Sequence, residues 1–513
     1  MVRFVTDYLD QTAQRYPDRV AFIDPKREIT FSRLWSEAMN VACALESYQK
    51  EKPVPVLIFL EKSIDCIASF LGTAYSGGFY SPVDTKMPVS RIEKIVATLH
   101  PAVVITDHAH EAQARSFSGE AVVMAYEDIA DARGSAQLDV QWGGASARRT
   151  DTDILYVLFT SGSTGMPKGV IINHRAVIDY IEWISDTYHL DDKIVFANQA
   201  QFYFDVSVQD IYGTLKNGGK ALLIPNRMFA TPVRVWKWML KHHVNTIEWV
   251  PSTLSLLANF DILGNLSLPP LKNIFFAGEV MPMKQLNYWR KFYPSATFAN
   301  LYGPTECTVI CAYYTLNRDF SDDDVLPMGR ACENAEALVL DAEDHLIPST
   351  MPDRIGELCI RGTCLSMGYY GNPEKTAEVF VQNPLQRNYP ETIYRTGDLV
   401  RYNEYGELVY VSRKDFQIKH RGYRIELGEI DAAASAIVGV DYCCCLFDSA
   451  RDQLVLVYAG EVSEETLRQQ LANRLQEYML PAVYHHRETM LFNLNGKVDR
   501  KALTAVYCQP AQA

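Results

Sequence analysis

The chain has 513 residues and a mass of 58.1 kDa, which exceeds one ordinary hydrophobic core and predicts two or more domains. A net charge of -13 and a pI near 5.4, without a basic stripe, argue against nucleic-acid binding. The first residues lack the pattern of a signal peptide, and the longest apolar runs, such as residues 54–60, are far too short to span a membrane. We therefore expect a cytoplasmic protein without a membrane span.

The 11 cysteines are scattered through the chain, which suits a reducing compartment. Cys443, Cys444 and Cys445 are consecutive, and such a run raises the question of a metal site. Adjacent residues of a strand point to opposite faces, so three in a row are poorly placed to share one ion. We expect them to be small apolar residues of a buried strand.

Apolar runs of strand length alternate with amphipathic stretches through most of the chain, which predicts an α/β architecture with largely buried sheets. The clearest runs are residues 54–60, 101–107, 193–198, 220–225 and 273–279.

The pattern changes after Gly356, where short strands and glycine-containing turns predict a β-rich region at about 330–412. The last segment has its own strand and helix signals and is long enough for a small domain. We place the boundary near residues 412–415, which gives predicted domains 1–412 and 413–513.

The sequence FTSGSTGMPKGV at residues 159–170 follows an apolar strand and is rich in glycine, serine and threonine. Such a loop brings backbone N–H groups and hydroxyls close to phosphate oxygens, and Lys168 adds positive charge. It is not a Walker loop, because Lys168 follows Pro167 and precedes Gly169. On its own the segment fits a phosphate loop and a flexible surface loop equally well.

Six further motifs accompany this loop in a fixed order along the chain. They are FDVSVQD (204–210), NLYGPTE (300–306), GELCIRG (356–362), YRTGDLV (394–400), SRKDFQIKHRGYRIELGEI (412–430) and NGKVDR (495–500). The series resembles the adenylate-forming superfamily of acyl-CoA synthetases, luciferases and peptide-synthetase adenylation domains. FDVSVQD and NGKVDRKAL resemble its amino-acid-activating branch. The resemblance extends from about residue 8 to residue 503.

The resemblance implies a large N-terminal adenylate-forming domain, made of two mixed α/β sheet subdomains and a small β-barrel. A small, mobile α+β C-terminal domain would follow it. The implied activity is ATP-dependent: a carboxylate attacks the α-phosphate of ATP, and the product is an acyl adenylate whose leaving group is AMP. Two anions must meet in this step, so positive charge and hydrogen-bond donors are needed at the phosphate.

Roles for individual residues follow from the matching motif positions. Lys497 would bridge the substrate carboxylate and the nucleotide, Glu306 would bind Mg²⁺, and Asp398 would accept hydrogen bonds from the ribose hydroxyls. The remaining positions are catalytic or nucleotide contacts: Thr160, Lys168 and Thr305 near phosphate, Asn300, Tyr302, Gly303 and Tyr410 around adenine, and Arg413 at the ribose or α-phosphate.

The resemblance also implies rotation of the C-terminal domain about a hinge at Asp415, after which Gly422 would leave room for a pantetheine arm. Two departures from the family pattern occur. Ser412 stands where the family usually has glycine, and residues 491–497 lack the usual proline before NGK. Neither departure removes a chemical group that the reaction uses.

Asp205 is the position that pairs with the substrate α-ammonium in the amino-acid branch, a charge-assisted contact. Motif offsets predict the other wall positions: Val206, Gln209, Trp249, Phe275, Ala277, Leu301, Val309 and Ile310. None of these is charged, and burial of a charged substrate side chain without a partner is costly. This set therefore predicts a small apolar amino acid.

The wall positions resemble those of prolyl-selective enzymes, so L-proline is the first expectation. D-alanine is the second, because residues 198–219 and the AGEVMP segment resemble D-alanine–carrier-protein ligases, although these usually have cysteine at Ala277. Valine and threonine also remain open. Other hypotheses are an acyl-CoA synthetase for a small acid, which would lack the Asp205 contact, and an inactive nucleotide-binding scaffold.

Only ten residues follow Leu503, and no carrier segment is recognisable. We therefore expect the acyl group to be transferred to the phosphopantetheine thiol of a separate carrier protein, as in nonribosomal peptide synthesis.

Overall fold

The computed structural model describes residues 2–49, 53–130, 149–162, 166–492 and 498–508. The chain forms two compact units, each described here by itself. Unit 1 comprises residues 1–85, 98–158 and 169–414, and unit 2 comprises residues 86–97, 159–168 and 415–513.

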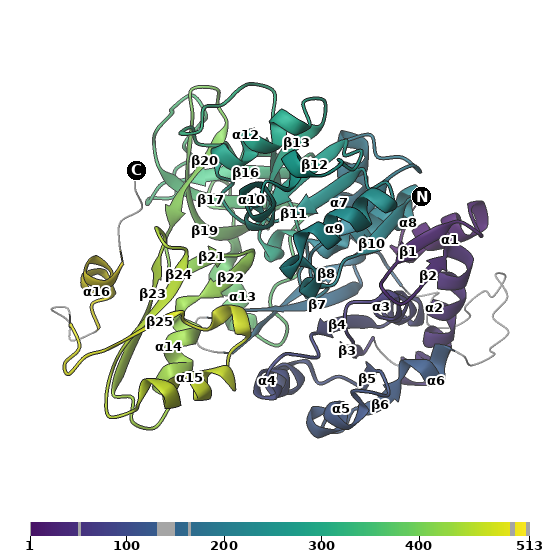
Figure 1. The fold of residues 1–513 in the computed structure, drawn as a ribbon, viewed down its shortest axis with the longest axis horizontal. Helices are drawn as coiled ribbons and strands as arrows, with labels where there is room; N and C mark the ends of the chain where they lie inside the picture. The colour runs from purple at the N-terminus through teal and green to yellow at the C-terminus, as the bar shows by residue number, and fades with distance from the viewer. Residues whose placement is uncertain (1, 50–52, 131–148, 163–165, 493–497, 509–513) are drawn as a thin grey trace. The chain divides into compact units, whose positions relative to one another are not determined.

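The largest sheet of unit 1 has parallel strands at its centre and antiparallel strands at both edges (Figure 1). Its central strands are buried on both faces, as parallel sheets covered by helices are. In spatial order the strands are β15 (Arg330–Ala331), β14 (Ala312–Thr315), β13 (Thr297–Tyr302), β12 (Asn273–Ala277), β11 (Thr246–Trp249), β9 (Val195–Asn198), β10 (Lys220–Leu223), β1 (Val20–Ile23) and β2 (Glu28–Thr30).

A second sheet contains the apolar runs of the N-terminal part of the chain, and its strands β3 to β6 pair in parallel. In spatial order its strands are β6 (Val122–Ala125), β5 (Val103–Thr106), β3 (Pro55–Phe59), β4 (Phe79–Val83), β7 (Ile154–Thr160) and β8 (Lys168–Asn173).

Helices cover both faces of the larger sheet, and the strand alternation decides which core each side chain enters. On β12, Phe275 belongs to one hydrophobic core and Phe276 to the other. The first core includes side chains of α1 (Thr6–Arg15), α2 (Phe31–Leu45), α3 (Ile64–Ser76), α7 (His174–Thr187) and α8 (Ser207–Asn217). The second includes side chains of α9 (Pro232–Lys241), α10 (Pro251–Asn259), α11 (Ile262–Asn265) and α12 (Met283–Phe292). The shorter elements of this unit are α5 (Glu111–Phe117), α6 (Tyr126–Ala130), η1 (Glu46–Tyr48) and η3 (Asn226–Ala230).

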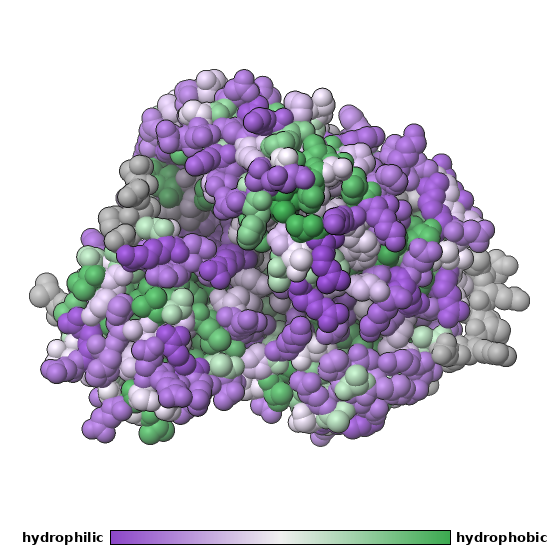
Figure 2. Space-filling view, in the orientation of Figure 1, coloured by the Kyte–Doolittle hydropathy of each residue, from purple (hydrophilic) through white to green (hydrophobic). Residues whose placement is uncertain are grey.

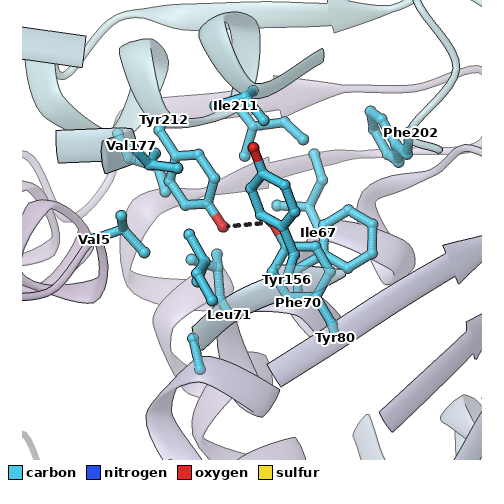
Figure 3. Close-up of a cluster of buried hydrophobic side chains, with 14 of the residues drawn as sticks. Val5, Ile67, Phe70, Leu71, Tyr80, Tyr156, Val177, Phe202, Ile211 and Tyr212 are labelled. Atoms are coloured by element: carbon cyan, nitrogen blue, oxygen red, sulfur yellow. Dashed lines mark hydrogen bonds between the residues drawn. The ribbon is translucent and has the colours of Figure 1, made fainter. Parts of the chain in front are cut away.

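Aromatic side chains fill the first core between the smaller sheet and α8 (Figure 3). Phe70 stacks on Tyr80 with ring centroids 4.3 Å apart, and the hydroxyl of Tyr80 lies 2.9 Å from that of Tyr212 on α8. The hydroxyl of Tyr156 on β7 points towards Ile211 of α8. This packing positions α8, whose first turn carries part of the FDVSVQD motif.

A third, antiparallel sheet of unit 1 lies in the region where the sequence predicts short strands. Its strands are β16 (Ala335–Leu340), β17 (Gly356–Gly362), β19 (Thr392–Tyr402), β18 (Phe380–Gln382) and β20 (Leu408–Arg413), with α13 (Pro373–Val379) before β18.

Unit 2 contains a hairpin, a small sheet and flanking helices. Its elements are α4 (Val89–Leu99, whose last residues belong to unit 1), β21 (Gln417–His420), β22 (Tyr423–Glu426), α14 (Leu427–Ser435), β23 (Tyr442–Asp448), β24 (Gln453–Ala459), α15 (Glu464–Ala472), η5 (Glu477–Met479), β25 (Val483–His486) and α16 (Arg500–Tyr507). Together with unit 1 it confirms the predicted α/β class, with large α/β sheets, a small β-sheet and a C-terminal α+β part.

The three consecutive cysteines lie on β23, and all three are buried. Cys443 and Cys445 enter one hydrophobic cluster, and Cys444 enters the cluster on the other face. The interpretation as apolar residues of a buried strand is confirmed.

Within the described ranges, no helix has the length and apolar character needed to cross a bilayer. The face shown in Figure 2 is mostly hydrophilic, with hydrophobic residues in separate groups.

Candidate functional site

Asp398 is the centre of a buried polar network in unit 1. It lies on β19, directly opposite Arg413 of β20 in the antiparallel ladder, and Nη1 of Arg413 donates to Oδ1 of Asp398 at 2.8 Å. The hydroxyl of Tyr302, at the end of β13, donates to Oδ2 of Asp398. Burial and the charge of Asp398 raise the pKa of Tyr302 well above its usual range, so this hydroxyl remains a donor. The structure thus brings together three residues that are distant in the sequence, all predicted to contact the nucleotide.

The turn after Tyr302 contains the next predicted nucleotide contacts, Gly303 and Thr305. A Cβ at Gly303 would lie 2.2 Å from the carbonyl oxygen of Val309, so the close return of the chain here requires glycine. Thr308 and Val309 have φ values of 48° and 70°, which β-branched residues rarely adopt. Strain of this kind costs about 1–3 kcal/mol per residue and tends to occur at functional sites.

Glu306 is the middle residue of the single turn η4 (Thr305–Cys307) and has no solvent exposure. The hydroxyl of Tyr369 donates to Oε1 of Glu306 at 2.8 Å, which holds the carboxylate in one orientation. A fixed carboxylate is a ligand type that Mg²⁺ takes in combination with phosphate oxygens, so the residues present fit this ion.

Asn300 and Tyr410 border the same region. Nδ2 of Asn300 donates to the carbonyl oxygen of Pro327 at 2.8 Å, and this contact fixes its amide. Tyr410 lies on β20 in the hydrophobic cluster that contains Tyr302. The predicted adenine contacts therefore come from β13 and β20.

The remaining catalytic positions belong to unit 2. Oγ1 of Thr160 lies 3.5 Å from the carbonyl oxygen of Lys168, and Nζ of Lys168 lies 3.4 Å from Oε1 of Glu426. Lys497 lies outside the described residues, so its predicted catalytic role stays a prediction.

Asp415 accepts a hydrogen bond of 3.2 Å from the backbone of Gln417. Arg421 and Gly422 form the turn between β21 and β22 with φ values of 52° and 81°. Two consecutive left-handed residues are typical of a tight hairpin turn and favour glycine. The hinge and channel roles of Asp415 and Gly422 are not tested by these local contacts.

Most of the predicted substrate positions share one face of the larger sheet. Leu301 of β13 pairs with Ala277 of β12, and both belong to the core that also contains Phe275. Val309 and Ile310 belong to the same core. Because Leu301 and Tyr302 are consecutive, one strand end carries a predicted substrate position and a predicted nucleotide position.

The FDVSVQD motif lies at the start of α8. The carbonyl oxygen of Asp205 accepts the backbone N–H of Val208 at 2.9 Å, and Val206 is the N-cap. Oε1 of Gln209 accepts the hydroxyl of Tyr180 at 2.7 Å. Asp205 is only partly buried, whereas Gln209 is completely buried.

Trp249 does not share the face of the other predicted wall positions. It pairs in register with Phe276, belongs to the opposite core, and donates its indole N–H to the carbonyl oxygen of Ala197 at 2.7 Å. The residue of β11 that pairs with Phe275 is Glu248. On the face shared by the other predicted wall positions, β11 therefore carries the buried carboxylate of Glu248 and not the indole of Trp249.

Glu248 has no solvent exposure, and neither carboxylate oxygen has a hydrogen-bond partner among the described residues. Burial, followed by the charges of Asp210 and Asp205, raises its pKa well above the usual range. The sequence did not predict a role for Glu248, because the neighbouring residue of β11, Trp249, was expected to line the substrate wall.

Two further charged residues, the partly buried Lys62 and the fully buried Asp210, were not predicted. Lys62 directs Nζ to the carbonyl oxygens of Asn198, Gln199 and Ala200 at 3.1–3.4 Å, and burial lowers its pKa to about 7. Burial raises the pKa of Asp210 to about 7, and its Oδ2 accepts a 2.8 Å hydrogen bond from Asn198. The only sequence signal for either residue is the place of Asp210 inside FDVSVQD.

Comparison with known proteins shows what this arrangement is similar to. Residues 9–370 match the family described as AMP-binding enzyme. Tyrocidine synthase 3 of Brevibacillus parabrevis is 31% identical over 96% of the chain, which spans 8% of that protein's length. The chain therefore covers only a small part of this large relative.

Two relatives are comparable in length. The L-proline–[L-prolyl-carrier protein] ligase of Streptomyces coelicolor is 31% identical over 96% of the chain and 94% of its own length. Zwittermicin A synthase ZmaJ of Bacillus cereus is 30% identical over 96% of the chain and 93% of its own length.

Solved structures agree with the fold. The Vibrio cholerae adenylation domain AlmE, in complex with glycyl-adenosine-5'-phosphate, has a TM-score of 0.81 at 19% identity and covers 98% of this chain and 97% of its own. A holo nonribosomal peptide synthetase protein with adenylation and PCP domains has a TM-score of 0.82 at 23% identity, covering 98% and 84%. At these identities the likeness is one of fold.

Proposed function

The chain belongs to the AMP-binding enzyme family, and we propose that it is an AMP-forming ligase that activates an amino acid with ATP as an aminoacyl adenylate. It then transfers the aminoacyl group to the phosphopantetheine thiol of a separate carrier protein. The observation that carries the proposal is the segment from Asn300 to Ile310, which joins the predicted nucleotide contacts to the predicted substrate wall. A substrate carboxylate held beside this wall would then lie next to the α-phosphate of ATP held by the predicted nucleotide contacts.

In the first step, a carboxylate oxygen of the amino acid attacks the α-phosphorus, a new P–O bond forms, and pyrophosphate leaves. In the second step, the carrier thiolate attacks the acyl carbon, the thioester forms, and AMP leaves with the former carboxylate oxygen. Lys497 would place positive charge between carboxylate and α-phosphate in the first step, where two anions approach each other.

The polar network around Asp398 would hold the ribose. Each carboxylate oxygen already accepts one hydrogen bond, from Tyr302 or Arg413, and retains capacity for a ribose hydroxyl. Arg413 would stay near the α-phosphate, and Glu306 would hold Mg²⁺, which supplies charge neutralisation at the phosphates.

Asp205 would pair with the α-ammonium of the substrate, which separates amino acids from acids that lack this group. The negative charge of Asp205 acts on the buried wall, because it contributes to the raised pKa values of both Glu248 and Tyr156. This placement supports the amino-acid hypothesis over the acyl-CoA synthetase hypothesis.

L-proline, the substrate predicted from the wall positions, is supported by similarity to the prolyl ligase. The wall positions that led to this choice were all uncharged. Glu248 adds a carboxylate to the face that these wall positions share. Proline has no side-chain group that could pair with a buried carboxylate. We therefore keep proline as a test compound and do not adopt it as the substrate. D-alanine shares this difficulty.

Transfer to a carrier is supported by the family relatives, among them a carrier-protein ligase of similar length. The physical requirement is a thiol on a long flexible arm. Incubation with ATP, an accepted amino acid and phosphopantetheinylated carrier proteins, followed by intact mass spectrometry, tests this half-reaction. The mass of the carrier is expected to rise by that of one aminoacyl group.

Amino-acid-dependent exchange of pyrophosphate into ATP tests the activation step. The wild-type chain is expected to exchange with at least one amino acid and not with its deaminated analogue. Replacement of a charged contact costs about 1.5–3 kcal/mol or more, so Asp205→Ala is expected to lower kcat/KM by roughly 10- to 100-fold. Asp186→Ala, at an exposed position of α7, is the matched control and should have little effect. Equal exchange with the deaminated analogue would overturn the amino-acid assignment.

A further inference from the structure

Glu248 is a buried carboxylate that the proposed reaction does not yet use. It lies on the central strand β11, in register with Phe275, and therefore faces the predicted substrate wall. Both carboxylate oxygens lack hydrogen-bond partners among the described residues, in an environment without solvent exposure. A buried polar group without a partner destabilises the folded protein, and more so when it is charged. Such a group at a wall position indicates a partner supplied by a ligand.

The neighbouring residues do not supply that partner. Asp205 and Asp210 both act on Glu248 as like charges. Lys62, the cation of this region, directs its ammonium to three backbone carbonyls and interacts with Asp210. Glu248 therefore lies in an environment with an excess of negative charge.

The surrounding polar atoms point to the same conclusion. Thr246 of β11 pairs with Phe196 of β9, so Glu248 and Asn198 lie at the same level of the sheet, two residues further along each strand. Oδ1 of Asn198 and Oδ1 of Asp210 also lack partners within the described residues. These two atoms are acceptors, as are the carboxylate oxygens of Glu248, and together they outnumber the donor Nε2 of Gln209, which also lacks a partner within the described residues. A ligand group with several N–H donors satisfies the acceptors of such a set.

We infer that Glu248 receives a cationic group on the side chain of the amino acid, so that the substrate is a basic amino acid rather than a small apolar one. The inference rests on the proposed function and specifies its substrate class. Asp205 holds the α-ammonium, and Glu248 holds the ammonium or guanidinium of the side chain. The carboxylates of Asp205 and Glu248 then pair with the two cationic groups of one substrate molecule.

It follows from the inference that an uncharged substrate should fit this site poorly. Proline, alanine or valine would occupy the wall and leave Glu248 buried without a partner. A site built to pair with a polar group discriminates strongly against analogues that lack it, by several orders of magnitude in favourable cases. By comparison, an apolar pocket distinguishes substrates that differ by one methylene by only about 10- to 200-fold.

The test is a comparison of matched amino acids in the pyrophosphate exchange assay with the wild-type chain. The pairs differ by the terminal amine: L-2,4-diaminobutyrate with L-2-aminobutyrate, L-ornithine with L-norvaline, and L-lysine with L-norleucine. L-arginine, L-proline and D-alanine complete the panel. We expect a basic member to have a kcat/KM at least about 100-fold above that of its uncharged partner.

Glu248→Gln keeps the shape of the side chain and removes its charge. The variant is expected to lose roughly 100-fold in kcat/KM for the preferred basic amino acid, mainly through KM, and to change the value for the uncharged partner by less than about threefold. An unchanged increase in melting temperature on addition of ATP shows that the variant is folded and binds nucleotide. Asp186→Ala again serves as the control.

The outcomes are distinct for the inference and for the proposed function. If proline, D-alanine or an uncharged partner gives the highest kcat/KM, the inference is overturned and amino-acid activation stands. If Glu248→Gln retains the full preference for the basic amino acid, the role of Glu248 is overturned. If no amino acid supports exchange by folded, ATP-binding protein, the proposed function falls, and the inference with it.

Discussion

Removal of the carboxylate of Asp398 should disturb both stability and nucleotide binding. Asp398 is 3% exposed and accepts hydrogen bonds from Arg413 and Tyr302. Asp398→Ala leaves a buried guanidinium and a buried hydroxyl without this acceptor. Loss of one partner of a buried ion pair costs about 3–5 kcal/mol, which corresponds to a fall in melting temperature on the order of 5 °C for a unit of this size.

Nucleotide affinity should fall as well, because Asp398 is proposed to bind the ribose hydroxyls. Hydrogen bonds to a charged group contribute about 1.5–3 kcal/mol each, so loss of two predicts a rise in the Kd of ATP of roughly 100-fold or more. Differential scanning calorimetry measures the first effect and isothermal titration calorimetry the second. Glu336→Ala, which removes an exposed ion pair with Arg361 in the same sheet, should lower stability by less than about 1 kcal/mol.

A double substitution separates the ion pair from general damage to the sheet. If the penalty of Asp398→Ala arises from the orphaned guanidinium, then addition of Arg413→Met should restore part of the lost stability, because no buried charge remains. The two single effects would then exceed the effect of the double substitution. Strictly additive losses, or a Kd of ATP unchanged in Asp398→Ala, would refute the reasoning.

Two further predictions concern titration and metal binding. Burial lowers the pKa of His174 to about 3, from an ordinary value of 6.5, so the unfolded chain takes up the proton first and stability falls as the pH drops below 6.5. At pH 5 the protonation of His174 in the unfolded chain lowers the free energy of unfolding by about 2 kcal/mol. In urea unfolding, His174→Gln should therefore reduce the stability difference between pH 7 and pH 5 by that amount. An unchanged difference would contradict the lowered pKa of His174. Glu306→Gln keeps an acceptor for Tyr369 but removes the charge, so the Mg²⁺ concentration for half-maximal exchange should rise at least about tenfold, and an unaltered Mg²⁺ dependence would argue against Glu306 as a ligand.

The α/β class of the fold could be predicted because it depends on local signals. Apolar runs with glycine-containing turns predicted the α/β sheets, and the alternation of a strand predicted the opposite faces of Cys443 and Cys444. That Tyr302, Asp398 and Arg413 would lie together was expected only from the resemblance to the adenylate-forming superfamily. Their hydrogen bonds are visible only in the structure.

The sequence was not sufficient to predict which residue of β11 faces the substrate wall. All residues of the TIEW strand are buried, so burial alternation does not reveal which of Glu248 and Trp249 faces the site. A shift of one residue exchanges the two faces of a strand completely. The positions of Lys62 and Asp210 could not be predicted from the sequence either, because charged residues are normally expected at the surface. The interaction between them depends on segments that lie far apart in the chain.

The central claim is that this chain forms an aminoacyl adenylate. The most direct test is to incubate it with ATP, Mg²⁺, hydroxylamine and an equimolar mixture of basic amino acids, apolar amino acids, proline and small acids without an amino group. Mass spectrometry then identifies the hydroxamate that forms from the activated acid. We predict an ATP-dependent hydroxamate of an amino acid, with a basic one dominant. A dominant hydroxamate of an acid without an α-amino group, or none from folded protein that binds ATP, would contradict the account.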